Sequence, residues 1–197
     1  MLAPEPRTAD APLTVLLVHN FYQQPGGEDR VFEVEGEMLE AHGHRVLRYT
    51  LHNDEVEGMG RAALAARTVW SRPAYEEVRR IVEAEGVDVV HVHNTLPLAS
   101  PAVYYAARAG GAAVVQTLHN YRFICPGALL LRDGKLCHDC VGRAVALPAV
   151  RHKCYRDSTA ATAAVVASTA VHKAMGTYRD AVDRYVVLSE FARNLFI

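Results

Sequence analysis

Four cysteines in the second half of the chain have the spacing of metal ligands. They are Cys125, Cys137, Cys140 and Cys154, which follow the pattern C-x11-C-x2-C-x13-C. Four thiolates complete a tetrahedral zinc shell, and such a shell can fold a segment that has no hydrophobic core of its own. The spacing therefore favours one structural zinc ion, with disulfides or reduced thiols as the alternatives. No redox partner motif supports an iron–sulfur cluster.

The dipeptide His-Asn occurs four times, each time directly after an apolar run. The copies are His19-Asn20, His52-Asn53, His93-Asn94 and His119-Asn120. Any single pair is best explained as satisfying backbone groups at the end of a strand. As a set, the pairs favour a groove that hydrogen-bonds a polyhydroxylated ligand. A multi-histidine metal site is the least favoured reading, because no carboxylate or H-x-x-x-H pattern accompanies the histidines.

A glycine pair lies between the first apolar run and a segment that starts with Glu28-Asp29. Glycines such as Gly26 and Gly27 let backbone amides approach a phosphate, and a helix N-terminus favours its negative charge. The sequence here is not the dinucleotide-binding G-x-G-x-x-G pattern, so a plain turn is an equally good interpretation.

Alternating apolar runs and helical patterns predict the framework that must position these residues. Strands are expected at residues 13–18, 45–51, 87–92, 112–118 and 184–188. Helices are expected between them, at 28–43, 58–70, 71–86, 100–108 and 159–178. In the first helix, Val31, Val34 and Met38 recur at helical spacing, with Phe32 and Leu39 beside them.

This order predicts an α/β fold with right-handed βαβ units, a mainly parallel Rossmann-like sheet and helices on both faces. Ligands bind such sheets at the carboxyl ends of the strands, where the His-Asn pairs should meet. Residues 121–155 lose all periodicity and form an irregular insertion that holds the four cysteines.

Length and composition limit the possible functions. The chain has 197 residues, half of them apolar and 22% charged, with a net charge of −1, so it suits one domain and offers no field for nucleic acid. A basic cluster at Arg143, Arg151, His152, Lys153 and Arg156 is interpreted as a solvated loop. Residues 1–12 are expected to be a loose tail before a domain at 13–197. Neither a signal peptide nor a membrane span is recognised, which predicts a cytoplasmic protein.

Several motifs together resemble a known family. VLLVHN from Val15, PGGEDRV from Pro25, VDVVHVHN from Val87 and VQTLHNYR from Val115 follow the order seen at the start of family 4 glycosyltransferases. The resemblance covers about residues 13–197. It implies the N-terminal half of a GT-B architecture, in which a C-terminal domain binds most of the nucleotide-sugar through an E-x7-E pair. The chain holds no such pair in the right context, so we expect an isolated half that is inactive without its C-terminal domain.

The resemblance also implies roles for individual residues. Gly26 and Gly27 would lie beside the donor diphosphate, and His119 would face the reacting sugar as a hydrogen-bonding or electrostatic support. The acceptor side would be lined by His19, Asn20, His93, Asn94, Tyr121 and Arg122. Retention of anomeric configuration, no catalytic metal and a role in polysaccharide biosynthesis are further implications.

The partners implied are a nucleotide-sugar donor and a carbohydrate or lipid-linked acceptor, which leaves room for contact with the inner face of a membrane. The alternative function is a non-enzymatic, zinc-stabilised α/β module that binds a carbohydrate or a nucleotide.

Overall fold

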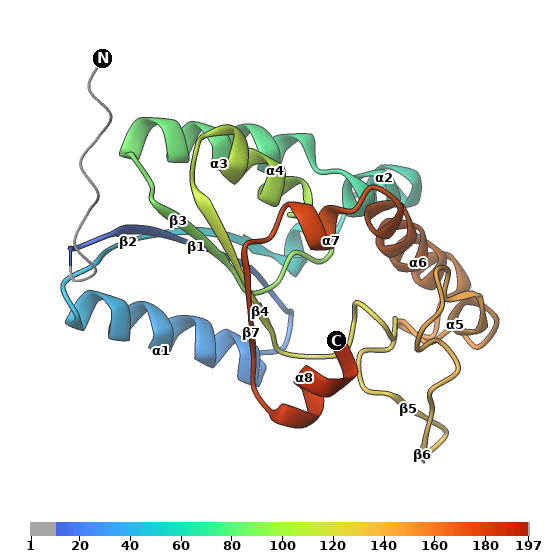
Figure 1. Ribbon diagram of the computed structural model, residues 1–197. Coiled ribbons are helices and arrows are strands. Elements are labelled where there is room, and N and C mark those ends of the chain that lie inside the picture. Colours follow the sequence, from blue (N-terminus) through green and yellow to red (C-terminus); the bar gives the residue numbers. More distant parts are fainter. Residues whose placement is uncertain (1–10, 197) are drawn as a thin grey trace.

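The structure, a computed structural model, describes residues 11–196 and centres on a five-stranded parallel sheet (Figure 1). The expected tail at residues 1–12 lies almost entirely outside the described residues. The strands are ordered β2-β1-β3-β4-β7, and their bounds are β1 Thr14–Phe21, β2 Arg45–His52, β3 Val89–Val92, β4 Ala113–Leu118 and β7 Arg184–Val187. All neighbouring pairs in this sheet are parallel, which confirms the predicted fold class.

Helices cover both faces of the sheet. One face carries α1 (Gly27–Ala41), and the other carries α3 (Arg72–Glu85) and α4 (Ala102–Ala109) (Figure 1). The remaining helical elements are η1 Asn53–Val56, α2 Arg61–Val69, α5 Leu147–Arg151, α6 Thr159–Ala174, α7 Thr177–Asp180 and α8 Glu190–Phe196. Among the described residues, no helix is long and apolar enough to cross a bilayer.

Local sequence signals account for the helix ends. The Ser71 hydroxyl accepts a hydrogen bond from the Ala74 amide at the start of α3, and Pro73 occupies its first turn. The same helix stops at Gly86, whose φ of 62° lies in the left-handed region that glycine adopts without strain. These ends agree with the cap and stop signals in the sequence.

Alternation along the central strands divides the core into two layers. Leu16 and Val18 pack with residues of α3 and α4, while Val15 and Leu17 pack with Phe32 of α1. The same alternation carries beyond the apolar residues, because successive side chains on a strand point to opposite faces. The histidines that continue the α1-facing row are therefore placed beneath that helix.

The prediction that Val34 and Met38 lie on the buried face of α1 is wrong. Val34 and Met38 are 43% and 49% exposed, and the buried residues of the helix are Asp29, Phe32 and Gly36. Since the helix repeats every 3.6 residues, the face that contains Phe32 also contains residues 29, 35, 36 and 39.

Close packing at Gly36 explains this choice of face. A Cβ atom at Gly36 would lie only 3.2 Å from Cδ1 of Leu17 and closer still to the Arg48 guanidinium, so a larger residue there would need both side chains to move. The helix approaches the sheet along the glycine side. As a consequence, two acidic residues, Asp29 and Glu35, are placed on the face that looks toward the strands.

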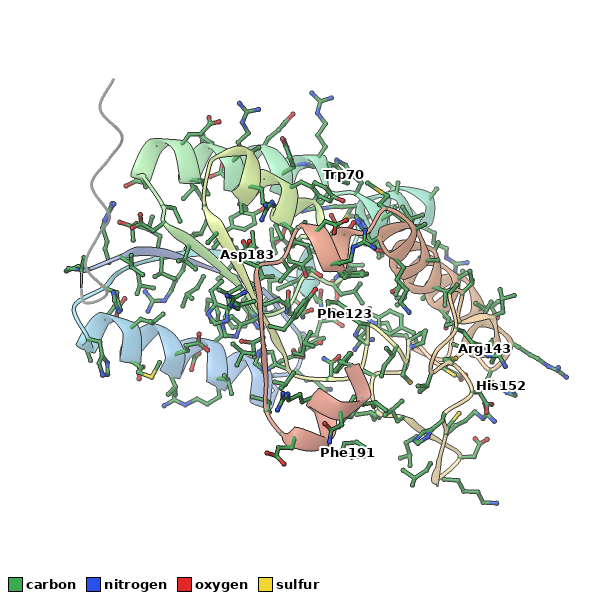
Figure 2. The ribbon with its side chains drawn as sticks, viewed as in Figure 1. Trp70, Phe123, Arg143, His152, Asp183 and Phe191 are labelled. Atoms are coloured by element: carbon green, nitrogen blue, oxygen red, sulfur yellow. The ribbon has the colours of Figure 1, made fainter. Side chains whose placement is uncertain are left out.

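Residues 121–155 form the predicted irregular segment, which projects from the body of the protein (Figure 1). Its regular parts are the hairpin β5 (Leu131–Arg132) with β6 (Lys135–Leu136) and the short helix α5, which packs on α6. Figure 2 shows Arg143 and His152 on this segment, well separated from Asp183 beside the edge strand β7. All five residues of the basic cluster are exposed, as expected of a solvated loop.

Candidate functional site

Three of the four predicted His-Asn histidines converge at the carboxyl edge of the sheet. The ring centroids of His19 and His93 are 6.2 Å apart, and those of His93 and His119 are 5.2 Å apart and stacked. His19 lies in β1, and His93 and His119 directly follow the adjacent strands β3 and β4. His52 is not part of this group because it ends the edge strand β2, where its side chain is 45% exposed and pairs with Asp54.

Asp29 connects the end of β1 to the glycine loop. Its Oδ1 lies 2.7 Å from Nε2 of His19, and its Oδ2 accepts a hydrogen bond of 2.7 Å from the Gly26 amide. The His19 ring is fully buried and stacks on Phe32 with a centroid distance of 4.9 Å. Burial lowers the pKa of His19, against the opposing influence of the Asp29 carboxylate. His19 is thereby part of the frame behind the loop.

His93 and His119 form a hydrogen-bonded pair of neutral imidazoles. Nδ1 of His93 lies 3.0 Å from Nε2 of His119, so one nitrogen donates and the other accepts. Burial, followed by the neighbouring imidazoles, lowers the pKa of His93 to about 2. Burial also lowers the pKa of His119 to about 4. At neutral pH, His119 is therefore equipped to hydrogen-bond a ligand but does not carry a positive charge.

The asparagines of the same motif build the scaffold. The Asn20 side chain donates to Oδ1 of Asn53 at 2.9 Å and accepts from the Leu98 amide at 2.9 Å. Asn94 donates to the Asn20 carbonyl at 2.7 Å and accepts from the Leu96 amide at 3.0 Å. Both amides therefore satisfy strand-end backbone groups, which was the favoured reading of a single pair. Their acceptor-binding roles stay predictions.

Arg122 reaches from the loop after β4 toward the N-terminus of α1. Burial raises the pKa of Tyr22 and of Glu28, and the nearby Arg122 guanidinium opposes both shifts. The Arg122 guanidinium also donates to the Pro126 carbonyl at 2.9 Å and lies 5.1 Å above the ring of Tyr155. The Arg122 cation therefore lies close to the glycine loop. It is beside Tyr22 and Glu28, which the sequence analysis did not select as site residues.

Tyr121 and the glycine pair have different surroundings. The Tyr121 ring contacts Phe191 and Phe196 of α8, each at 6.2 Å between centroids. Gly27 has open space where a side chain would stand, and Gly26 is the extended residue that begins α1. A ligand can therefore approach the backbone at the N-terminus of this helix.

A small cavity lies directly behind His119. Its volume is about 50 Å³, and its lining includes His93, Gln116, His119 and Tyr178. This space suits water-sized molecules. The hydroxyl of Tyr104 donates to Oε1 of Gln116 at 2.6 Å, which leaves the Gln116 amide to donate to the His93 carbonyl at 3.1 Å.

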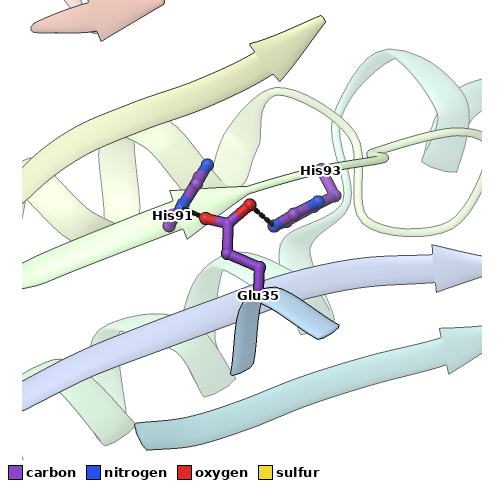
Figure 3. Close-up of side chains that lie close together, drawn as sticks. All are labelled: Glu35, His91 and His93. Carbon is purple, nitrogen blue, oxygen red and sulfur yellow. Dashed lines mark ion pairs between the residues drawn. The ribbon is translucent and has the colours of Figure 1, made fainter. Parts of the chain in front are cut away.

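His19, His93 and His119 form a row along the edge of the sheet, called the histidine row below. A second group of side chains adjoins this row. Glu35 rises from α1 between His91 of β3 and His93, which directly follows that strand (Figure 3). Its Oε1 lies 2.5 Å from Nδ1 of His91, and its Oε2 lies 3.8 Å from Nε2 of His93. Nε2 of His91 is also 2.8 Å from the Thr117 hydroxyl.

Sequence reasoning missed both Glu35 and His91. The signal was the alternating pair His91 and His93 in one strand together with an acidic residue three positions after Phe32. It was hidden by the wrong orientation assigned to α1.

The four cysteines approach one another without forming a compact ligand group. Cys125 Sγ and Cys154 Cβ lie 3.9 Å and 3.5 Å from the position that a Cβ atom at Gly127 would occupy, and Cys140 is buried in an apolar cluster that Cys154 also touches. Burial raises the pKa of the Cys140 and Cys154 thiols. Among the described residues, the three potential metal ligands with donor atoms all within 4.8 Å are those of Glu35, His91 and His93.

Comparison with known families identifies the chain. Residues 25–197 match the profile described as Glycosyltransferase Family 4, which covers most of the sequence. No curated protein matches the chain significantly. The match includes four of the five strands of the parallel sheet and the loop that contains Gly26 and Gly27. Only β1 precedes it. The chain therefore belongs to glycosyltransferase family 4.

Proposed function

We propose that this family 4 glycosyltransferase domain provides the acceptor side of a retaining sugar transfer from a nucleotide-sugar, with His119 at the reacting centre. The observation that carries the proposal is the placement of His119. It is half-buried at the end of β4, held by His93 from behind, and located on the edge where parallel sheets bind ligands.

Transfer breaks the bond between the anomeric carbon and the donor phosphate. Positive charge develops on the sugar and negative charge on the leaving diphosphate. The open backbone at Gly27, the N-terminus of α1 and the Arg122 guanidinium are suited to stabilise that negative charge. A neutral His119 is suited to hydrogen-bond the reacting sugar or its acceptor.

We propose that a second, donor-binding domain completes the cleft. The cavity behind His119 is too small for a sugar, so a pocket that surrounds the substrate needs a second wall. Closing two domains over the edge of the sheet excludes water, which protects the activated donor from hydrolysis. Turnover by this domain alone should consequently be weak or absent.

A transfer assay with radiolabelled nucleotide-sugars tests the proposal. The chain is assayed alone and joined to a C-terminal donor-binding domain of the same family, with carbohydrate and lipid-linked acceptors. Transfer only by the joined protein, lost on His119→Ala, supports the proposal. Saturable binding of a sugar or nucleotide by the chain, with no transfer in either form, supports the alternative of a non-enzymatic binding module.

We also propose that the cysteine segment binds one structural zinc ion. The support is the approach of Cys125 and Cys154 around Gly127 and the unusual backbone nearby. Six non-glycine residues between 128 and 157 have positive φ angles: Ala128, Leu130, Asp133, Lys153, Arg156 and Asp157. Such conformations persist only where the surroundings impose them, and four bonds to one ion are a strong local constraint. Side-chain rotations are needed to close the shell, since the sulfurs lie apart here.

A further inference from the structure

We infer that Glu35, His91 and His93 form a zinc-binding site beneath the histidine row. A metal site was the least favoured sequence interpretation, because no carboxylate accompanied the histidines along the chain. The fold removes this objection by bringing Glu35 from α1 against β3 (Figure 3). The three ligand atoms come from α1, from β3 and from the residue that directly follows β3.

The spacing of the donor atoms fits a single ion. The carboxylate of Glu35 lies 2.5 Å from Nδ1 of His91 and 3.8 Å from Nε2 of His93. These distances bracket the separation of about 3.3 Å between two ligands on a tetrahedral zinc ion with bonds of about 2.0–2.1 Å. All three donor atoms lie within 4.8 Å of one another, so side-chain adjustments alone can bring them around one ion.

A buried nitrogen without a partner points into the site. Nε2 of His93 has no hydrogen-bond partner among the described residues, and the His93 side chain is 0% exposed. An unpartnered polar atom in the interior costs free energy, which a metal bond at that atom removes. Glu35 is 19% exposed, so an ion can enter along the side of α1. Three protein ligands leave one position for water.

The second nitrogen of each histidine is held as metal-bound imidazoles usually are. Nε2 of His91 lies 2.8 Å from the Thr117 hydroxyl, and Nδ1 of His93 lies 3.0 Å from Nε2 of His119. Such outer partners fix the tautomer and orientation of the ligand. With the ion bound to Nε2 of His93, the proton of the ring is on Nδ1. This N–H then donates a hydrogen bond to Nε2 of His119. Metal binding thereby reaches the residue placed at the reacting centre.

The ligand set favours a transition metal over magnesium or calcium. Two imidazoles and one carboxylate suit zinc, and also ferrous iron, whereas magnesium and calcium prefer shells made of oxygen. The other acidic group of this helix face, Asp29, already bonds His19 and the Gly26 amide, so it is not a further ligand. The site differs from the cysteine segment in both its ligands and its location.

Zinc titration followed by imidazole ¹⁵N NMR tests this inference in the full chain. Zinc should shift the resonances of His91 Nδ1 and His93 Nε2, which separates this site from ion uptake by the cysteines. Glu35→Gln should need at least about tenfold more zinc for the same shift. Glu37→Gln, an exposed residue of the same helix, is the matched control and should titrate like the wild type.

A second variant keeps the test decisive if Glu35→Gln fails to fold. Thr117→Val preserves all three ligands and the buried volume, and it should weaken zinc binding by about 10- to 100-fold through loss of the outer hydrogen bond. Unmoved His91 and His93 resonances at saturating zinc would overturn the inference, and so would equal affinity of Glu35→Gln and wild type. Because the readout is binding, it is independent of whether the domain supports sugar transfer.

Discussion

The histidine row and the cysteine segment both carry metal-capable side chains, but different forces hold them in place. His19, His93 and His119 extend from three hydrogen-bonded strands, so the sheet fixes their spacing whether or not a ligand is bound. The cysteines lie on irregular backbone, and only Cys140 among them is buried.

The difference teaches where preorganisation comes from. A site on regular elements exists before its ligand arrives, because packing and ladder hydrogen bonds position the side chains. A site on irregular backbone depends on the ligand for its shape, so metal binding and folding of that segment become one process. The two regions should therefore respond differently to chelators and substitutions.

The largest effect is expected from Cys137→Ser. Loss of one ligand should release the ion and unfold residues 121–155 while the sheet stays intact. Hydrogen exchange should show the segment losing protection, with β1, β3 and β4 unchanged, and metal analysis should show about one zinc per chain lost. His138→Ala, which lies between the same two cysteines, should keep both the protection of the segment and the bound zinc. The contradicting result is a purified protein that contains no metal and has four titratable thiols, while residues 121–155 remain protected from hydrogen exchange. The cysteine segment would then not depend on a metal for its shape.

The next largest effect is expected from His119→Ala in the protein joined to a donor-binding domain. Removing a hydrogen-bonding group from the reacting centre should lower kcat by about 10²-fold or more, with folding unchanged. The matched control is His52→Ala, because His52 has the same His-Asn motif but lies outside the row. Initial rates of sugar transfer provide the measurement. Near-normal turnover of His119→Ala would reject its place at the centre.

A smaller effect is expected from Asp29→Ala, which tests the frame behind the row. The buried carboxylate bonds both His19 and the Gly26 amide, so its removal leaves two polar groups unsatisfied. The free energy of unfolding should fall by about 2–4 kcal/mol, measured with urea. Glu37→Ala, on the exposed side of α1, should change it by no more than about 0.5 kcal/mol. Equal losses in the two variants would show that Asp29 does not hold the frame.

The smallest effect concerns His172, which anchors α6, the helix on which the cysteine segment packs. Its ring lies 2.8 Å from the Val69 carbonyl and 2.9 Å from the Thr177 hydroxyl, and burial lowers its pKa. The unfolded chain protonates this imidazole near its ordinary pKa of about 6.5, so below that pH the unfolded state binds more protons. Stability therefore falls as the pH decreases.

Urea unfolding between about pH 7 and about pH 5 measures this dependence. His172→Gln should flatten the slope by at most about 1.4 kcal/mol per pH unit. The exposed His152→Gln should leave the slope as in the wild type. An unchanged slope in His172→Gln would mean that other buried histidines carry the whole dependence.

Much of the fold was predictable because its signals are local. The apolar runs, the Ser71 cap and the stop at Gly86 each depend on a few neighbouring residues, and they correctly indicated the alternation of strands and helices. The convergence of His19, His93 and His119 followed from one rule about parallel sheets. The prediction for residues 121–155 was also correct, since absence of periodicity is itself visible in a sequence.

The tertiary structure alone decided which residues share a face across the chain. The orientation of α1 depends on the close approach of Gly36 to Leu17, a contact between residues far apart in sequence. With α1 in this orientation, Val34 and Met38 point outward and Glu35 lies between His91 and His93. The sequence determined the strand ends and the histidines on them, whereas helix packing, which sums many distant contacts, determined the acidic residues that meet them.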